Sequence, residues 1–257
     1  MSDQFLNPLF ELQKTLYQST NYTRRRLHQR RWAWVVNSIE KYAINMPVDK
    51  AIEYGPGSGI YLPTLAKNFK SVVAADVENA YLNGILPLVD EIAGLSLVVD
   101  DILDSKLPKE DFGLVLCSEV LEHVKNPEHA IDTLFKILMP GGIAIVTTPQ
   151  RFSLLELCCK VAFLPGVIQL VRKIYREPVL ETGHISLRSS VEFRGALIEN
   201  GFEILEEEKY GLYIPLLAEF GGGVGGRFIE GLERYFKNTF LNELYWTQAY
   251  VLRRPLR

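Results

Sequence analysis

Residues 51–59 read Ala51-Ile-Glu-Tyr-Gly55-Pro-Gly57-Ser-Gly59, a short apolar run that leads directly into a glycine-rich turn. Residues 51–54 predict a buried strand, and residues 60–68 predict the helix that follows the turn. Glycines let the backbone of such a turn approach a ligand without a clash of Cβ atoms. The spacing G-x-G-x-G differs from the G-x-G-x-x-G of dinucleotide-binding proteins, so it favours a nucleoside over a pyrophosphate and argues against a nicotinamide-dependent oxidoreductase.

The same alternation of short apolar runs and amphipathic stretches continues to residue 149. Strands are expected at the following ranges: 71–76, 95–99, 112–118, 143–148, 202–207 and 245–253. We therefore predict an α/β protein with a Rossmann-like, doubly wound, mostly parallel seven-stranded sheet whose last strand is antiparallel. N-terminal helices and a helical insertion after the fifth strand complete the expected fold.

Domain boundaries follow from this pattern. Residues 1–46 are expected to form a helical cap, and residues 47–257 the catalytic domain, with the insertion at about 151–182. The glycine-rich stretch at 221–226 predicts a flexible loop.

Composition limits the class of protein. The 257 residues include 28 Lys and Arg against 31 Asp and Glu, so the formal charge is −3 and a broadly basic nucleic-acid surface is not expected. Three cysteines are too few for a disulfide framework. The N-terminus lacks a signal pattern, and no run reaches about 18 uninterrupted apolar residues. We expect a cytoplasmic protein.

Two basic segments leave alternatives open. Five arginines lie between positions 24 and 31, either as a solvated helix face or as a lid that contacts an anionic substrate or lipid. Residues 151–176 carry five basic residues and one acid (5 − 1 = +4) among many apolar ones. This pattern fits an interfacial helix pair on a membrane, a lid over a hydrophobic substrate, or a cap helix that packs on the core or forms a dimer face.

Carboxylates stand where three predicted strands end. Asp76 follows the second strand and is placed to accept hydrogen bonds from ribose hydroxyls. Asp100 and Asp101 follow the third strand; we favour Asp101 for an adenine amine, with Ile102 on the ring face. Glu53, just before the glycine turn, is placed to bind an ammonium group.

The whole series resembles the class I S-adenosylmethionine-dependent methyltransferases, in particular the small-molecule branch that includes the ubiquinone-biosynthesis O-methyltransferases. The resemblance rests on five stretches in this order: 53–59, 73–76, 99–102, 114–124 (which contains Ser-Glu-Val-Leu-Glu-His-Val) and 138–142.

This resemblance implies roles for individual residues. S-adenosylmethionine would contact the following positions: Glu53, Gly55, Gly57, Asp76, Val77, Asp101, Ile102, Ser118 and Glu119. His184 is the candidate general base or substrate ligand, and a structural hydrogen-bonding role is the alternative. His123 is expected to pack or cap rather than react, and no spacing indicates a metal site.

The implied activity is methyl transfer to a small, hydrophobic or lipid-like acceptor by in-line displacement. A peripheral membrane contact through residues 151–176 is left open, and the oligomeric state is not indicated. Two alternatives remain: a non-catalytic protein that keeps the fold, and a methyltransferase that acts on RNA or protein.

Overall fold

The computed structural model describes residues 14–44, 46, 48–164, 166–169 and 183–256. Within these residues seven strands form one sheet, in the order β3-β2-β1-β4-β5-β7-β6. The strands are β1 (Lys50–Tyr54), β2 (Ser71–Asp76), β3 (Leu95–Val99), β4 (Phe112–Ser118), β5 (Leu138–Pro149), β6 (Glu203–Tyr210) and β7 (Thr247–Arg253).

Strand β1 stands where the strand order reverses. It pairs in parallel with β2 and with β4, so that Tyr54 lies opposite both Ala75 and Cys117. The loops after these strands therefore meet at one edge of the sheet, where ligands bind in such folds. Strand β7 runs antiparallel between β5 and β6. The predicted seven-stranded, mostly parallel sheet with an antiparallel last strand is confirmed.

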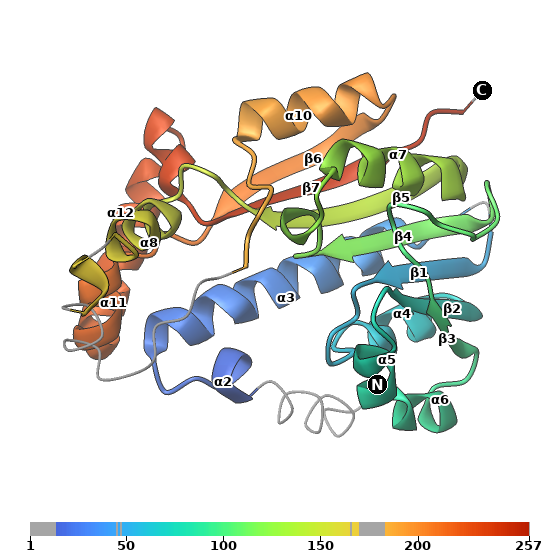
Figure 1. Cartoon of the computed structure of the whole chain (residues 1–257), viewed down its shortest axis with the longest axis horizontal. Helices are drawn as coiled ribbons and strands as arrows, with labels where there is room; N and C mark the ends of the chain where they lie inside the picture. Colours follow the sequence, from blue (N-terminus) through green and yellow to red (C-terminus); the bar gives the residue numbers. More distant parts are fainter. Residues whose placement is uncertain (1–13, 45, 47, 165, 170–182, 257) are drawn as a thin grey trace.

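Helices cover both faces of the sheet (Figure 1). They are α2 (Lys14–Tyr17), α3 (Tyr22–Tyr42), α4 (Leu62–Asn68), α5 (Asn79–Ile85), α6 (Pro87–Glu91), α7 (Pro127–Ile137), α8 (Leu154–Ala162), α10 (Ser190–Glu199), α11 (Pro215–Phe220) and α12 (Gly222–Phe236), with 3-10 turns η1 (Leu121–His123) and η2 (Phe240–Leu244). Apolar residues of α7 and α10, such as Leu134 and Phe193, pack on one face. Val35 and Ile39 of α3 pack with α4 and α5 on the other.

Four arginines of helix α3 form ion pairs with acidic side chains of the same chain. Arg24 pairs with Glu219 of α11, and Arg26 pairs with Glu230 and Glu233 of α12. Arg30 also pairs with Glu233, and Arg31 pairs with Glu119. Neither sequence-based alternative, a solvated face or a contact to an external anion, describes these four arginines. Their partners lie about 90 to 200 residues away in sequence, beyond the reach of a local pattern.

The expectation of a flexible loop at 221–226 is wrong. Helix α12 begins at Gly222, and Gly225 and Gly226 are buried. A Cβ atom on Gly226 would lie 2.1 Å from the ring of Tyr22 on α3. The glycine therefore allows the two helices to approach closely, and the gain from this packing outweighs the low helix propensity of glycine.

The expected cap and insertion are described in part. Residues 1–13 and 170–182, together with residue 165, lie outside the described residues. Helix α8 belongs to the insertion, and Figure 1 shows it at the same end of the molecule as α11 and α12. Among the described residues, no helix is both long and apolar enough to cross a membrane.

Candidate active site

The glycine turn after β1 forms the floor of a cavity. Gly55 has a φ of +66°, a conformation that favours glycine, and its N–H donates to the carbonyl of Ala75 on β2. A Cβ atom at Gly55 would lie 2.5 Å from Cγ2 of Val120. A side chain here would fill the space between the loops after β1 and β4.

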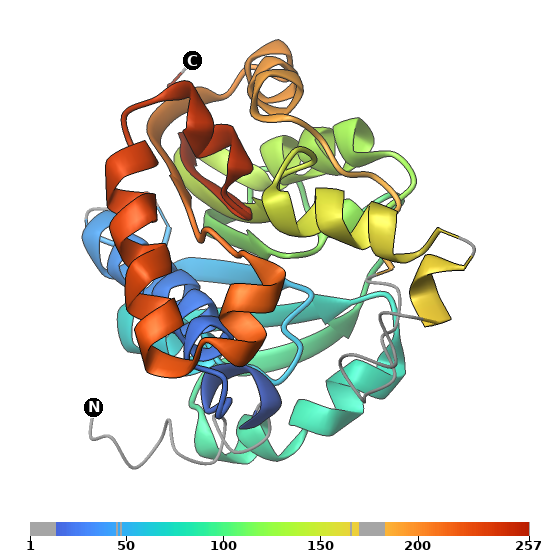
Figure 2. The same ribbon diagram turned by 90° about the vertical axis from the view of Figure 1, so that its left-hand side faces the viewer.

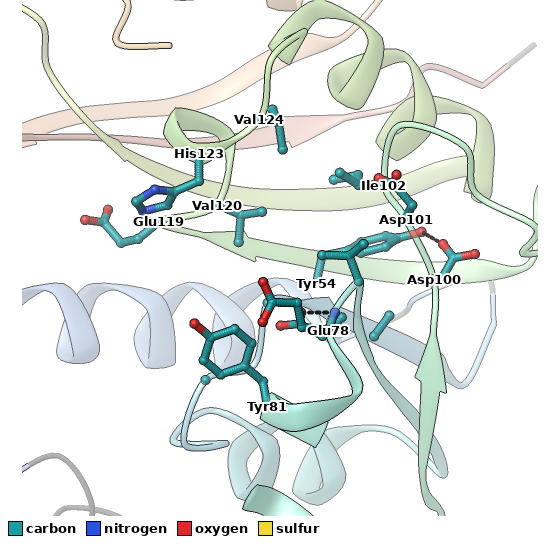
Figure 3. Close-up of a pocket in the computed structure, with 15 residues that line it drawn as sticks. Tyr54, Glu78, Tyr81, Asp100, Asp101, Ile102, Glu119, Val120, His123 and Val124 are labelled. Atoms are coloured by element: carbon teal, nitrogen blue, oxygen red, sulfur yellow. Dashed lines mark hydrogen bonds between the residues drawn. The ribbon is translucent and has the colours of Figure 1, made fainter. Parts of the chain in front are cut away.

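The cavity has a volume of about 470 Å³ and lies over the carboxyl ends of β1 to β4. Its lining consists of Tyr54, Gly55, Gly57, Ala75, Asp76, Val77, Glu78, Tyr81, Asp100, Asp101, Ile102, Glu119, Val120, His123 and Val124. Figure 3 shows Glu119 and His123 at one end and Asp101 and Ile102 at the other. Seven of the nine predicted cofactor residues line this one cavity; Glu53 and Ser118 do not.

Asp76 and Asp101 each have one oxygen engaged by a local turn. The N–H of Glu78 donates to Oδ1 of Asp76 over 2.9 Å, and the N–H of Leu103 donates to Oδ1 of Asp101 over 2.9 Å. These bonds hold each carboxylate at the strand end and leave its second oxygen without a hydrogen bond from another described residue. Both side chains therefore keep acceptor capacity toward the cavity.

Asp100 is committed to the protein instead. It is buried and accepts hydrogen bonds from the hydroxyl of Tyr54 over 2.8 Å and from the N–H of Lys106 over 2.8 Å. Of the two adjacent aspartates, Asp101 is thus the more available acceptor. The preference for Asp101 at an adenine amine stays a prediction.

Glu53 is a buried acid with an unsatisfied oxygen. Its side chain is 2% exposed, and Oε2 has no hydrogen-bond partner in the described structure. Burial raises the pKa of Glu53 well above its ordinary value. A cationic group placed beside Oε2 would supply the missing partner. Glu53 does not line the cavity, so its assignment to an ammonium group stays a prediction.

At the other end of the cavity, Glu119 is held by long-range contacts. It has a φ of +60°, which is rare for a residue other than glycine. Its Oε2 lies 2.6 Å from Nη1 of the buried Arg31, and its Oε1 accepts from Oγ1 of Thr147 over 3.0 Å. Ser118 also bonds Thr147, over 2.8 Å. The ion pair from α3 thus fixes a strained residue at the rim of the cavity.

His184 lies beside the cavity and is oriented by a carboxylate. Its Nδ1 is 2.9 Å from Oε1 of Glu156, and both side chains are at most 10% exposed. The N–H groups of Ile185 and Ser186 donate to the carbonyl of Glu122, which fixes the segment after His184 next to η1. The rings of His184 and His123 have their centroids 5.3 Å apart. His123 lines the cavity, and its Nδ1 lies 3.2 Å from the carbonyl oxygen of Gly183. The expectation that it packs or caps rather than reacts stays a prediction.

Glu122 adds a third group to these two histidines. Within the described residues, ligand atoms of Glu122, His123 and His184 all lie within 4.8 Å of one another. A carboxylate and two imidazoles can bind a divalent cation. Burial, then the charge of Glu119, raises the pKa of Glu122. This cluster has a donor set that suits a divalent cation. The predicted absence of a metal site therefore stays a prediction.

Several lining residues were missed by the sequence analysis. They are Tyr54, Glu78, Tyr81, Val120 and Val124. The position of Glu78 could have been predicted from the sequence, since it lies two residues after Asp76 in the same strand-end loop. The contact of Arg31 with Glu119 behind the cavity could not, because only the fold brings α3 to the end of β4.

Comparisons with known proteins agree with this geometry. A family model described as a methyltransferase domain matches residues 23–207. The ubiquinone biosynthesis O-methyltransferase of Pseudomonas fluorescens (strain SBW25) is 30% identical over 120 residues, which cover 45% of this chain and 50% of that protein. The chain thus spans about half the length of the curated relatives it matches.

Solved structures show the same fold at low identity. An S-adenosylmethionine-dependent methyltransferase from Mesorhizobium loti has a TM-score of 0.59 at 15% identity, with 87% of this chain and 98% of that chain covered. The [4+2]-cyclase SpnF has a TM-score of 0.60 at 14% identity, with 93% and 84% covered. The match of the family model over most of the chain carries the assignment: the chain belongs to the S-adenosylmethionine-dependent methyltransferase family and has its class I fold.

Proposed function

We propose that the chain transfers the methyl group of S-adenosylmethionine to a small acceptor by in-line displacement at the methyl carbon. The observation that carries this proposal is the cavity over the carboxyl ends of β1 to β4, lined by the glycine turn, Asp76 and Asp101. When bound, the cofactor supplies a methyl group that is activated by a positively charged sulfur. The protein's main contribution is then alignment, which can lower a barrier by about 7–11 kcal/mol.

The cofactor would lie across the cavity from the adenine end to the histidine end. Asp101 and Ile102 would contact the adenine and Asp76 the ribose hydroxyls. Gly55 and Gly57 would lie against the methionine and ribose part of the cofactor. The unsatisfied oxygen of Glu53 supports its assignment to the methionine ammonium. Ser118 and Glu119 would lie near the methionyl end, where Arg31 keeps Glu119 in place.

His184 is the proposed general base for an acceptor hydroxyl. Because Oε1 of Glu156 engages Nδ1 of His184, Nε2 is the nitrogen left to take a proton. Glu156 would act as a positioning residue through His184, in the way a buried carboxylate orients a catalytic histidine. A general base is needed for a hydroxyl, and the relatives named ubiquinone biosynthesis O-methyltransferases support an oxygen acceptor.

A hydrophobic or lipid-like acceptor and a membrane contact through residues 151–176 belong to the same proposal. The described part of this segment supports it, because Leu157 and Val161 of α8 are exposed beside the exposed Lys160. Residue 165 and residues 170–176 lie outside the described residues. A charge reversal at Arg172 and Lys173 is expected to lower co-sedimentation with anionic vesicles; equal recovery in the supernatant would contradict the contact.

The test of the proposed activity is a methyl-transfer assay against a metabolite extract, with mass detection of products that gain CH₂. The expected result is a product that requires both the protein and S-adenosylmethionine. Cofactor binding without any product in small-molecule, RNA and protein fractions would favour a non-catalytic member of the family. Transfer confined to the RNA or protein fraction would favour a macromolecular acceptor.

A further inference from the structure

Helix α12 carries an apolar stripe on its outer side. Val224, Phe228 and Tyr235 are 73%, 58% and 77% exposed, and Gly231 completes the spacing i, i+4, i+7, i+11. This spacing places all four on one face of the helix. The opposite face, with Ile229 and Gly226, is buried against the protein. The stripe lies after residue 207, outside the part of the chain matched by the methyltransferase family model.

The acids of α11 and α12 point inward. Glu219 lies 3.0 Å from Arg24, and Glu230 lies 2.9 Å from Arg26. Glu233 is buried and pairs with Arg26 and Arg30. Burial alone would raise the pKa of Glu233, but the charge of Arg30 and the N–H of Gly211 help to keep it below its ordinary value. Ionised acids of these helices are therefore matched internally by α3.

The cations of α12 point outward. Arg227 and Arg234 are exposed, and neither forms an ion pair with a described residue. Both lie at the same edge of the apolar stripe, three and ten residues after Val224. Helix α8 also has its acid inside and its cation outside: Glu156 is buried and contacts His184, whereas Lys160 is exposed. Figure 2, which turns this end of the molecule toward the viewer, shows α12 on one side of this end and α8 on the other.

We propose that the outer face of α12, defined by Val224, Phe228, Arg227, Arg234 and Tyr235, docks on the anionic surface of a lipid bilayer. An interfacial helix combines an apolar face that enters the headgroup region with cations that attract anionic lipids. The distribution of charge favours an anionic lipid surface as the partner, because the described acids of α11 and α12 face the protein and the unpaired cations face outward. A second copy docked antiparallel through the same face would bring these cations against their equivalents, which disfavours that form of self-association.

The experiment is vesicle flotation of the full chain with phosphatidylcholine vesicles that contain or lack 30% phosphatidylglycerol, a composition chosen for the test. The wild type is expected to float with the anionic vesicles and to be released by high salt. Phe228→Glu is expected to reduce the bound fraction, and Arg227→Glu with Arg234→Glu to reduce it by about tenfold or more. Val191→Glu on α10, a residue that is 78% exposed, makes the same kind of change elsewhere and should bind as the wild type.

Each other outcome overturns the proposal. Equal flotation of wild type and α12 variants would show that another surface, such as residues 151–176, accounts for membrane binding. If the wild type does not float, α12 does not bind a bilayer. If the protein forms a dimer in solution that Phe228→Glu dissociates, the partner of α12 is a second copy of the chain. Calorimetric binding of S-adenosylhomocysteine by every variant shows that each variant is folded. Membrane docking of α12 does not depend on methyl transfer, so its failure is distinguishable from a failure of the proposed activity.

Discussion

The two ends of the cavity are built in different ways. At the adenine and ribose end, Asp76 and Asp101 are held by N–H groups two residues further along the chain. At the histidine end, Glu119 is held by Arg31 of α3, and His184 by Glu156 of α8. The first end is a product of local strand-end loops, and the second depends on contacts between distant elements. Substitutions should therefore be able to disrupt the two ends of the cavity separately.

The largest separation is expected from the histidine end. His184→Ala should lower kcat by about 10²–10⁴ while leaving cofactor affinity unchanged, because the base acts on the acceptor. Glu156→Gln should also lower kcat and change the pH profile, since it alters the hydrogen bond that orients His184. Steady-state kinetics with the acceptor from the metabolite assay would measure both.

A metal role for His184 is tested in the same kinetics. If chelation abolishes turnover and Mg²⁺ or Zn²⁺ restores it in the wild type, the cluster with Glu122 and His123 acts as a ligand set and the general-base role is wrong. Unchanged turnover after chelation, together with the loss in His184→Ala, agrees with the base.

The support behind Glu119 should be costly to remove. Arg31→Met leaves the Glu119 carboxylate without its cation, and breaking a buried ion pair costs about 3–5 kcal/mol. We expect chemical denaturation to show a loss of this order. The double variant Arg31→Met with Glu119→Gln should regain part of it; a double variant as unstable as the single one would argue that Arg31 acts through its packing alone.

A smaller effect is expected at the contact between α3 and α12, which holds the arginine face of α3. Gly226→Ala places a Cβ atom against Tyr22 and should destabilise the protein by about 1–3 kcal/mol. Gly231→Ala on the same helix meets no atom within 4 Å and should stabilise it by about 0.5–1 kcal/mol. Thermal unfolding compares the pair, and equal shifts would contradict the close helix contact.

The fold and the local end of the site were largely predictable, because they depend on short-range patterns. The strand before Gly55, the strand-end Asp76 and the apolar Ile102 are each visible within about ten residues of sequence. The partners of Arg31 and Glu156, the bond from Tyr54 to Asp100, and the helical state of Gly222–Gly226 were not. Each of these depends on which distant element the fold brings alongside, and no local spacing encodes that.

A pH dependence of the stability is expected from His28 on α3. Burial, then the charges of Arg31 and Arg24, lowers the pKa of His28 to about 3 in the folded protein, against an ordinary value of 6.5. The unfolded chain therefore takes up a proton at a higher pH than the folded chain does. The free energy of unfolding should fall as the pH drops from about 6.5 toward 3, by at most about 1.4 kcal/mol per pH unit.

His28→Gln removes this titrating group and should flatten the slope within that window. Denaturation at several pH values measures it, and the exposed His129→Gln on α7 serves as the control histidine. An unchanged slope in His28→Gln would show that His28 does not carry this pH dependence.

In the proposed function, the cavity over β1 to β4 binds the cofactor and Asp76 binds its ribose. Titration calorimetry with S-adenosylhomocysteine tests both points on the wild type, Asp76→Ala and the matched variant Asp132→Ala. The account predicts binding by the wild type and Asp132→Ala, and an affinity about 100-fold lower for Asp76→Ala, because two hydrogen bonds to a charged group are lost. No binding by the wild type, or equal affinity in all three proteins, would contradict it.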